Sequence, residues 1–311
     1  MKRIISAFFM CIVISIFILG SIVNICAVSP IDSKKSSSLT LQYKHGNDYY
    51  SDIEIKIYRV AEVFDDGTYA LCGDFKDYPV SIYDVYSQTE WKNICSTLAT
   101  FAVSDNITPD YSTVTDKNGT VSFTDILPGM YLTQSVNVKN EAEYVKFESF
   151  LTAVPTPDDN GNHNYDVTAY PKCEVKKLTE NKKEIEYKIV KHWKDNGYTL
   201  KRPKSIEVDV LKDGIVQSTR ILSGDNNWSY SWSAPDDGSQ WQAIEKNIPT
   251  NYSITVIHKD NTIIITNTYD TVYKDPPKTG ETTVLWPWVV AMSVSGGMII
   301  LLTIWRKRIN G

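Results

Sequence analysis

The chain has 311 residues and a formal net charge of −5 at pH 7. An acidic balance without a basic patch argues against a nucleic-acid partner. Between its two apolar ends lie about 250 residues, enough for two modest domains. This middle part is rich in Tyr, Thr, Val and Ile, which favour β-strands. We therefore expect an all-β protein made of two tandem domains.

The N-terminus has the pattern of a secretory signal peptide. Lys2 and Arg3 precede an apolar run that continues to about Ile25, and the small residue Ala27 offers a cleavage position. An uncleaved membrane anchor is the alternative interpretation. We expect residues 1–27 to direct export.

The first expected domain covers residues 36–172 and is dominated by strand-like runs. These runs are Leu39–Tyr43, Ile53–Val60, Tyr69–Leu71, Thr120–Phe123, Tyr131–Gln134 and Tyr165–Tyr170. Asp65-Asp66-Gly67, between two of them, is a hairpin turn signal. The pattern predicts a sheet-rich domain with short connections.

One segment of this domain has helical periodicity. Between Thr89 and Phe101 the apolar residues Trp91, Ile94, Cys95, Leu98 and Phe101 recur at helical spacing, which predicts an amphipathic helix packed on the sheet. Cys95 on this apolar stripe is better explained as a core residue than as a reactive thiol. Outside the signal peptide the cysteines are Cys72, Cys95 and Cys173, an odd number that makes a poor disulfide framework. Whether Cys72 and Cys95 pair stays open.

The same domain resembles the N-terminal domain of Gram-positive pilins and related adhesins. The segments that carry the resemblance are Ile57–Ala61, Asn118–Phe123, Leu127–Leu132, Phe150–Pro155 and Tyr165–Lys172. The resemblance implies a β-sandwich, and it makes Lys172 the candidate pilin lysine, which a sortase would join to the threonine of the next subunit. A lysine at the end of a strand is also ordinary, and similar endings occur in wall proteins that do not polymerise.

A linker at 173–183 is expected to lead into a second domain at 184–270. Alternation in Ile206–Leu211 and the apolar run Ile263–Ile265 both predict strands. Turn residues at Asp213-Gly214 and Asp236–Gly238 separate the strand-like runs. A Greek-key sandwich fits this pattern.

The second domain resembles the collagen-adhesin B-type domain along its full length. The matching segments are Val190–Asp195, Arg202-Pro203, Ile206–Leu211, Asn226–Trp232, Ala243–Pro249 and Ile264–Tyr269. The resemblance implies a self-made isopeptide bond between Lys191 and Asn267, with Glu245 as the assisting acid and proton relay. Trp193, Trp228 and Trp232 are candidates for its apolar surroundings.

This chemistry needs those residue types. A lysine amine attacks only when it is neutral, and burial lowers its pKa. Burial also keeps a carboxyl group protonated, so that it can polarise the amide and relay protons as ammonia leaves. The alternative is a partly buried Lys191–Glu245 salt bridge beside a hydrogen-bonded Asn267. In the first domain the corresponding acid position is Gln134, which cannot relay a proton, so we expect no such bond there.

The C-terminal end combines a short motif, an apolar span and a basic tail. Residues 284–305 carry no charge and are long enough for a transmembrane helix, and the basic residues in 306–311 predict a cytoplasmic tail. Within the preceding linker, 271–283, the motif Pro276-Pro277-Lys278-Thr279-Gly280 resembles the Leu-Pro-x-Thr-Gly sorting signal of Gram-positive wall proteins. The resemblance implies sortase cleavage between Thr279 and Gly280; Pro276 replaces the usual Leu and leaves the sortase class open.

These features predict a secreted surface protein that passes through a membrane-spanning precursor and is then anchored to the Gram-positive cell wall. Its expected role is a structural stalk or adhesin, with sortase and peptidoglycan as partners. The alternatives are a pilus subunit polymerised through Lys172 and Thr279, and a collagen- or glycan-binding module. Other pilin subunits and host extracellular matrix are the corresponding further partners. We expect no cofactor and no metal, because the four histidines show no metal-binding spacing, and no enzymatic activity beyond one intramolecular turnover.

Overall fold

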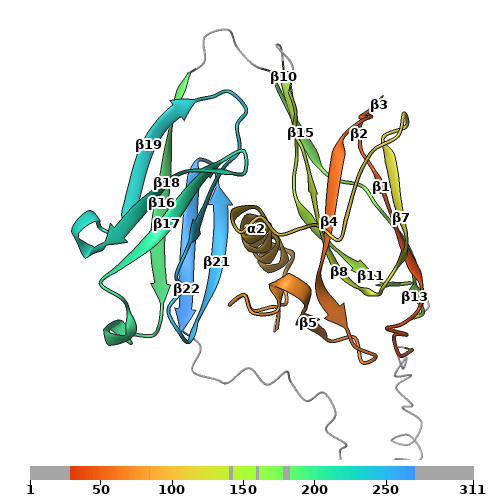
Figure 1. Cartoon of the computed structure of the whole chain (residues 1–311), viewed down its shortest axis with the longest axis horizontal. Coiled ribbons are helices and arrows are strands. Elements are labelled where there is room, and N and C mark those ends of the chain that lie inside the picture. Colours follow the sequence, from red (N-terminus) through yellow and green to blue (C-terminus); the bar gives the residue numbers. More distant parts are fainter. Residues whose placement is uncertain (1–28, 84, 140–142, 159–160, 178–182, 270–311) are drawn as a thin grey trace, which may run out of the picture. The chain divides into compact units, whose positions relative to one another are not determined.

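The structure is a computed structural model, and it describes residues 29–269 except 84, 140–142, 159–160 and 178–182 (Figure 1). The predicted signal peptide, sorting motif, transmembrane helix and basic tail lie outside the described residues. Everything described falls within one compact unit, Met1–Val272. In this described part, no helix combines the length and the apolar character needed to cross a membrane.

The N-terminal half is a β-sandwich, as predicted. One sheet has the order β14-β1-β7, a second has the order β11-β8-β4-β5 with β6 also on β4, and a third has the order β15-β10-β9. The strands are β1 (Ser37–Gln42), β4 (Glu54–Val63), β5 (Tyr69–Leu71), β6 (Tyr111–Val114), β7 (Thr120–Ile126), β8 (Gly129–Ser135), β9 (Val138–Lys139), β10 (Glu143–Phe147), β11 (Phe150–Val154), β14 (Asp166–Ala169) and β15 (Cys173–Lys177). Two short hairpins, β2-β3 (Lys44–His45, Asp48–Tyr49) and β12-β13 (Thr156–Pro157, His163–Asn164), complete it. The six strand-like runs predicted from the sequence are all strands.

Alternating side chains build the core of this sandwich. In β1 every second residue is buried, and Leu39 and Leu41 are fully enclosed. Such alternation places one face of a strand against the core. β1 pairs in parallel with β14 and antiparallel with β7, so it is the central strand of its sheet.

The segment expected as a linker contains a strand. β15 pairs antiparallel with β10, and Val175 lies opposite Val145. β15 therefore extends the first sandwich past residue 172, where that domain was expected to end.

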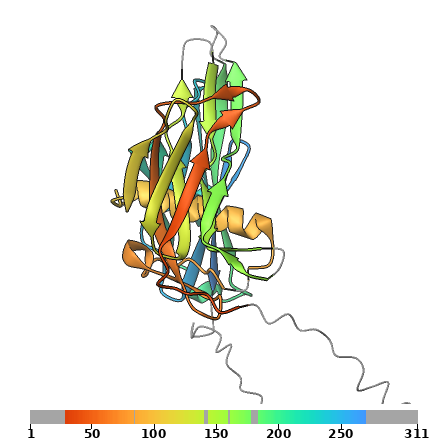
Figure 2. The same ribbon diagram turned by 90° about the vertical axis from the view of Figure 1, so that its right-hand side faces the viewer.

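The predicted helix is α2 (Gln88–Ser104), longer than expected at its C-terminal end. Its N-terminus is fixed by a capping box, in which the Ser87 hydroxyl accepts from Glu90 N–H and the Glu90 carboxylate accepts from Ser87 N–H. The predicted apolar stripe is buried at Ile94, Cys95, Leu98 and Phe101. Figure 2 shows that its axis runs across the long strands.

The C-terminal half is a second sandwich of two sheets, in the orders β19-β16-β22-β21 and β18-β17-β20. Its strands are β16 (Glu184–Lys194), β17 (Ser205–Lys212), β18 (Ile215–Ser223), β19 (Ser229–Pro235), β20 (Trp241–Glu245), β21 (Tyr252–Lys259) and β22 (Thr262–Tyr269). The first strand, β16, pairs in parallel with the last, β22. The strands predicted at Ile206–Leu211 and Ile263–Ile265 are confirmed as parts of β17 and β22.

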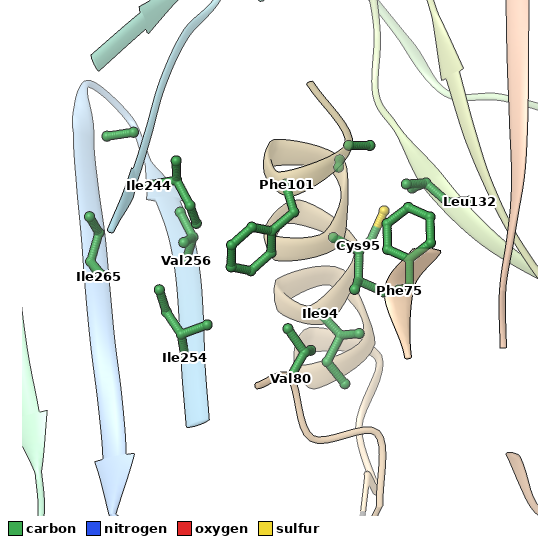
Figure 3. Packing of buried hydrophobic residues seen from close by; sticks show 14 of the residues in the cluster. Phe75, Val80, Ile94, Cys95, Phe101, Leu132, Ile244, Ile254, Val256 and Ile265 are labelled. Carbon is green, nitrogen blue, oxygen red and sulfur yellow. The ribbon is translucent and has the colours of Figure 1, made fainter. Parts of the chain in front are cut away.

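Both faces of α2 are covered, one by each sandwich (Figure 3). Cys95 faces Phe75 and Leu132, whereas Phe101 and Val80 point toward Ile254 and Val256. Buried Thr97 also accepts a 2.8 Å hydrogen bond from Val256 N–H, and Pro79 O accepts one of 2.8 Å from Ile254 N–H. β21 is an edge strand, so these bonds cover donors that an edge would otherwise expose.

The three cysteines of the described part are free thiols. Cys95 is buried in the core, as its place on the helix predicted, and burial raises its thiol pKa to about 12. Cys72 donates a weak 3.3 Å hydrogen bond to Arg59 O. The pairing of Cys72 with Cys95 that the sequence left open is not formed.

Candidate crosslinking site

Three strands bring Lys191, Asn267 and Glu245 together inside the second sandwich. Lys191 lies on the inward face of β16, where Ile189 and Lys191 are buried and their neighbours are more exposed. Asn267 lies on the inward face of β22, buried in alternation with Ile263 and Ile265. The parallel register sets Lys191 opposite Ile265 and Trp193 opposite Asn267, so Lys191 and Asn267 are diagonal neighbours. Glu245 ends β20 in the facing sheet.

The three polar groups are close and enclosed. Lys191 Nζ lies 2.9 Å from Glu245 Oε2, and the side chains of both residues are fully buried. Asn267 Nδ2 donates a 3.1 Å hydrogen bond to Glu245 Oε1, and Asn267 is 0% exposed. The Lys191–Glu245 contact has the distance of an ion pair, and neither atom has another partner among the described residues. Glu245 therefore bridges the amine and the amide.

Burial governs the protonation of this pair. Desolvation lowers the pKa of Lys191 to about 8, although the nearby Glu245 carboxylate partly opposes this. Desolvation also raises the pKa of Glu245, against the opposing effects of Lys191 and Asn267. Both shifts favour uncharged forms. Transfer of one proton across the 2.9 Å contact turns the ion pair into a neutral amine and a carboxylic acid.

The amide of Asn267 keeps one unsatisfied group. Asn267 Oδ1 is buried and has no hydrogen-bond partner among the described residues. An amide that turns by 180° about its last side-chain bond exchanges its oxygen and nitrogen at nearly constant shape. In the turned orientation, a protonated Glu245 would donate to Asn267 Oδ1. The site can therefore polarise the amide carbonyl with the same carboxyl group that accepts the lysine proton.

Two of the three predicted tryptophans line this site. Lys191 Nζ lies 4.4 Å from the centroid of the Trp193 ring, and the Trp193 and Trp228 rings meet edge to face at 5.3 Å. Trp232 belongs to a different cluster, stacked between Tyr187 and Tyr230 and in edge contact with Trp241. The amine therefore faces an aromatic wall on one side and Glu245 on the other.

The polar residues beyond Trp193 were not predicted as part of the site. Asp195 is buried and binds the guanidinium of Arg202 through two hydrogen bonds, of 2.5 and 2.8 Å. The Tyr252 hydroxyl donates to the same carboxylate at 3.3 Å. These partners hold the pKa of Asp195 below its usual range. The inward alternation of β16 continues from Lys191 through Trp193 to Asp195, and this was the signal available in the sequence.

The remaining predicted residues lie away from this site. Lys172 is exposed in the short connection between β14 and β15, where its backbone O accepts from Glu148 N–H, so the strand expected to reach Tyr170 ends at Ala169. Gln134, at the predicted acid position of the first sandwich, donates a 3.0 Å hydrogen bond to Ala99 O. Among the residues that the structure describes, no lysine besides Lys191 is buried. The sorting residues Pro276, Pro277, Lys278, Thr279 and Gly280 lie outside the described part.

Comparison with known families identifies the second sandwich. Residues 187–268 match the family described as Cna protein B-type domain. They form a Cna B-type domain. The sequence is also 30% identical over 104 residues to the collagen adhesin of Staphylococcus aureus, a match that covers 29% of this chain and 9% of that protein. This chain therefore spans a small fraction of that curated relative, and the match concerns one region.

Solved structures give weaker likenesses. A single B repeat unit of the collagen-binding surface protein of Staphylococcus aureus aligns over 76% of this chain and 100% of its own, at 14% identity and a TM-score of 0.26. The full-length major pilin SpaD of Corynebacterium diphtheriae covers 77% of this chain and 93% of its own, at 12% identity and a TM-score of 0.28. The minor pilin of Streptococcus agalactiae covers 78% and 99%, at 14% identity and a TM-score of 0.24. Scores this low carry no functional argument, and the assignment of the Cna B-type domain rests on the family match.

Proposed function

We propose that this chain is a cell-wall-linked surface protein that serves as a stalk or adhesin, and that its Cna B-type domain crosslinks itself by an isopeptide bond between Lys191 and Asn267. The observation that carries the proposal is the enclosed contact of three groups: Lys191 Nζ 2.9 Å from Glu245, and Glu245 3.1 Å from Asn267 Nδ2. An amine, an amide and a shared carboxyl group are the complete set of reactants and proton relay for this bond.

The reaction needs no added reagent. The Lys191 proton passes to Glu245, and the neutral Nζ attacks Asn267 Cγ while the carboxylic acid donates to Oδ1. A C–N bond forms between Cγ and Nζ, a second amine proton passes through Glu245 to Nδ2, and the bond between Cγ and Nδ2 breaks to release ammonia. Glu245 keeps the first proton and ends the single turnover as a neutral carboxylic acid. The product is an amide that links β16 to β22.

A permanent salt bridge is the competing interpretation of the same residues. Burial of an ion pair costs each charge its hydration, and a buried pair is often no better for stability than apolar residues of similar volume. Lys191 Nζ and Glu245 Oε2 here have no further hydrogen-bond partner, and Asn267 Oδ1 is unpaired among the described residues. Amide formation removes both charges, so the bond accounts for polar groups that a salt bridge leaves poorly satisfied.

Digestion and tandem mass spectrometry test the crosslink at residue level. The secreted region, residues 29–272, is unfolded, digested with a protease and searched for a branched peptide that contains both Lys191 and Asn267. We expect that peptide, and we expect it to be absent from the Lys191→Arg variant, which keeps a positive charge but cannot form the same amide. Two linear peptides from the parent protein would refute the crosslink.

Wall attachment is the second part of the proposal. The Pro276–Gly280 motif, the following apolar span and the basic tail support sortase processing at Thr279, with peptidoglycan as the acceptor. Adhesion to host matrix is included because the curated relative is named a collagen adhesin. A Thr279→Ala variant should remain in the membrane fraction, and equal amounts of variant and parent in cell-wall digests would contradict sorting.

A pilus subunit is the second candidate function. Lys172 favours it, because its side chain is exposed in a short connection whose backbone is fixed by the bond from Glu148. Polymerisation through Lys172 and Thr279 should give ladders of high molecular weight that survive boiling in detergent. The Lys172→Arg variant should lose these ladders and keep wall attachment. Monomers alone in the parent strain would leave the stalk as the function.

A further inference from the structure

We infer that Trp193 is a positioning residue for the crosslinking reaction, and that the Asp195–Arg202 pair with Tyr252 holds its ring in place. This inference rests on the proposed isopeptide chemistry and assigns roles to residues beyond the three reacting groups. It follows from how the end of the second sandwich is closed beside Lys191.

Trp193 limits where the Lys191 amine can go. A lysine side chain has four rotatable methylene groups and many rotamers, so proximity alone does not align its nitrogen with an amide carbon. The ring face of Trp193 lies 4.4 Å from Nζ, and Trp193 is the register partner of Asn267 on the neighbouring strand. The ring therefore stands beside both the nucleophile and its target, and Glu245 approaches from the facing sheet.

A cluster of Asp195, Arg202 and Tyr252 holds the Trp193 ring in place. The Arg202 guanidinium lies 5.7 Å from the Trp193 centroid and is tied to Asp195 by its two hydrogen bonds. Tyr252 meets the Trp193 ring edge to face at 5.4 Å while its hydroxyl binds Asp195. Asp195 and Arg202 lie in the connection between β16 and β17, and Tyr252 begins β21, so the cluster links two separate segments around the ring.

The backbone at Trp228 adds an independent observation. Asn227 and Trp228 have φ values of 52° and 54°, a conformation that is rare and strained for a bulky residue. The conformation is held by hydrogen bonds of 2.8 Å from Trp228 N–H to Ser223 O and from Lys191 N–H to Trp228 O. It places the Trp228 ring against Trp193 and ties it to the backbone of the nucleophile itself.

The aromatic wall affects the protonation of Lys191 and Glu245 because it excludes water. Glu245 on β20 is the titratable group that faces Lys191, whereas Asn267 on β22 and Trp193 and Trp228 beside it do not titrate. The neutral, reactive form of the pair becomes tenfold rarer for each unit by which the pKa of Lys191 exceeds the pKa of Glu245. Burial brings the two pKa values together and so raises the neutral fraction. An intact aromatic wall keeps water out and keeps that separation small.

Refolding kinetics test the inference. The region 29–272 is purified unfolded and refolded at pH values from about 4 to 10, with intact mass reporting the loss of ammonia and circular dichroism reporting folding. Trp193→Leu should crosslink about tenfold more slowly than the parent at neutral pH, over a broader pH range because water restores both pKa values. Trp193→Phe, which keeps a ring, should stay within about threefold of the parent. Trp232→Leu is the matched control and should react at the parent rate.

Each outcome separates this inference from the proposed function. A parent protein that never loses ammonia refutes the crosslink itself. A crosslinking parent with an unchanged rate and pH profile in Trp193→Leu overturns the role of Trp193. Equal slowing in Trp193→Leu and Trp232→Leu without broadening also overturns it, because that result reports general packing. If Trp193→Leu does not fold, Arg202→Lys replaces it: this variant keeps the charge but loses the two-pronged bond, and a parent-like profile in it refutes the supporting cluster.

Discussion

At the scale of single residues, the chemistry of the site depends on one proton shared between Lys191 and Glu245. The ion pair and the neutral pair contain the same number of protons, so pH does not convert one into the other. A low pH adds a proton to the pair, which leaves Lys191 charged. A high pH removes a proton, which leaves Glu245 unable to donate. Two macroscopic pKa values therefore bound the reactive range.

The first prediction is a bell-shaped dependence of crosslinking rate on pH. The rate should fall on the acid side as the pH drops through the pKa of Glu245, which burial raises above its ordinary value. It should fall on the alkaline side as the pH rises through the pKa of Lys191, about 8. Intact mass sampled during refolding of residues 29–272 gives the rates. A rate that keeps rising well above pH 8 would show that the protonated carboxyl group is not required.

At the scale of secondary structure, α2 joins the two sandwiches through a polar residue. Thr97 accepts from Val256 N–H on the edge strand β21 and donates to Asn93 O, both at 2.8 Å. Thr97→Val keeps the shape and removes the acceptor, so a buried N–H loses its partner at a cost of about 1–3 kcal/mol. The free energy of unfolding of residues 29–272 should fall by that amount. Thr40→Val, which loses an exposed hydroxyl contact to Ser122, is the control and should change it little.

Amide hydrogen exchange locates the same effect. Val256 N–H should exchange faster in Thr97→Val than in the parent, because its hydrogen bond is missing. Unchanged exchange at Val256 together with unchanged stability would show that α2 does not cover the edge of β21.

A glycine in the β19–β20 turn gives a second prediction at this scale. Gly238 has a φ of +80°, and a Cβ built on it would lie 2.6 Å from Tyr144 Cδ1 on β10. Gly67 has nearly the same φ, +83°, with nothing within 4 Å of its Cβ position. Both Gly→Ala variants carry the backbone cost of a left-handed alanine, about 1 kcal/mol. Gly238→Ala should lower the melting temperature more than Gly67→Ala, and equal shifts would mean that Tyr144 does not pack there.

Periodicity in the sequence predicted the strands and the helix stripe because each reflects burial on one side. It did not predict what covers the other side of α2. Thr97 and Thr100 lie off the apolar stripe and look solvent-exposed in a helix packed on one sheet, yet both are fully buried, and Thr97 bonds to the second sandwich. β15 was missed for a similar reason, since its charged residues Glu174, Lys176 and Lys177 resemble a linker until β10 is known to lie beside it.

The candidate site was predicted as residue types, and its geometry was not. Lys191, Glu245 and Asn267 came from a family resemblance, and three separate strands place them in one enclosed cluster. Asp195 and Arg202 lie in segments that carry the family resemblance, but their spacing in the sequence did not predict that they pair. Only the closed end of the sandwich shows that Asp195 is buried and that the pair packs beside Trp193.

At the scale of the whole molecule, the proposed bond ties together the first and last strands of the second sandwich. β16 and β22 are neighbours in parallel register, so tension on the chain would cross an amide link before it could separate these strands. In the chain-entropy account, a link across a loop as long as Lys191 to Asn267 is worth about 4.5 kcal/mol.

Loss of the link should therefore be visible in stability. Glu245→Ala and Lys191→Ala proteins should melt about 10–20 °C below the parent and should be cut faster by trypsin. Glu245→Ala should lose somewhat more, because it leaves a buried lysine without its partner. Calorimetry and timed digestion measure both effects. Parent-like melting and digestion of the two variants would remove the mechanical role of the link.

The most direct test of the central claim is the intact mass of residues 29–272. The parent protein should be lighter than its calculated mass by about 17 Da, one ammonia, because the Lys191 amine displaces the amide nitrogen of Asn267. Lys191→Ala and Glu245→Ala should each have their full calculated masses, since one lacks the nucleophile and the other the proton relay. A parent protein that keeps its full calculated mass after days at neutral pH would contradict the account and leave Lys191 and Glu245 as a buried salt bridge.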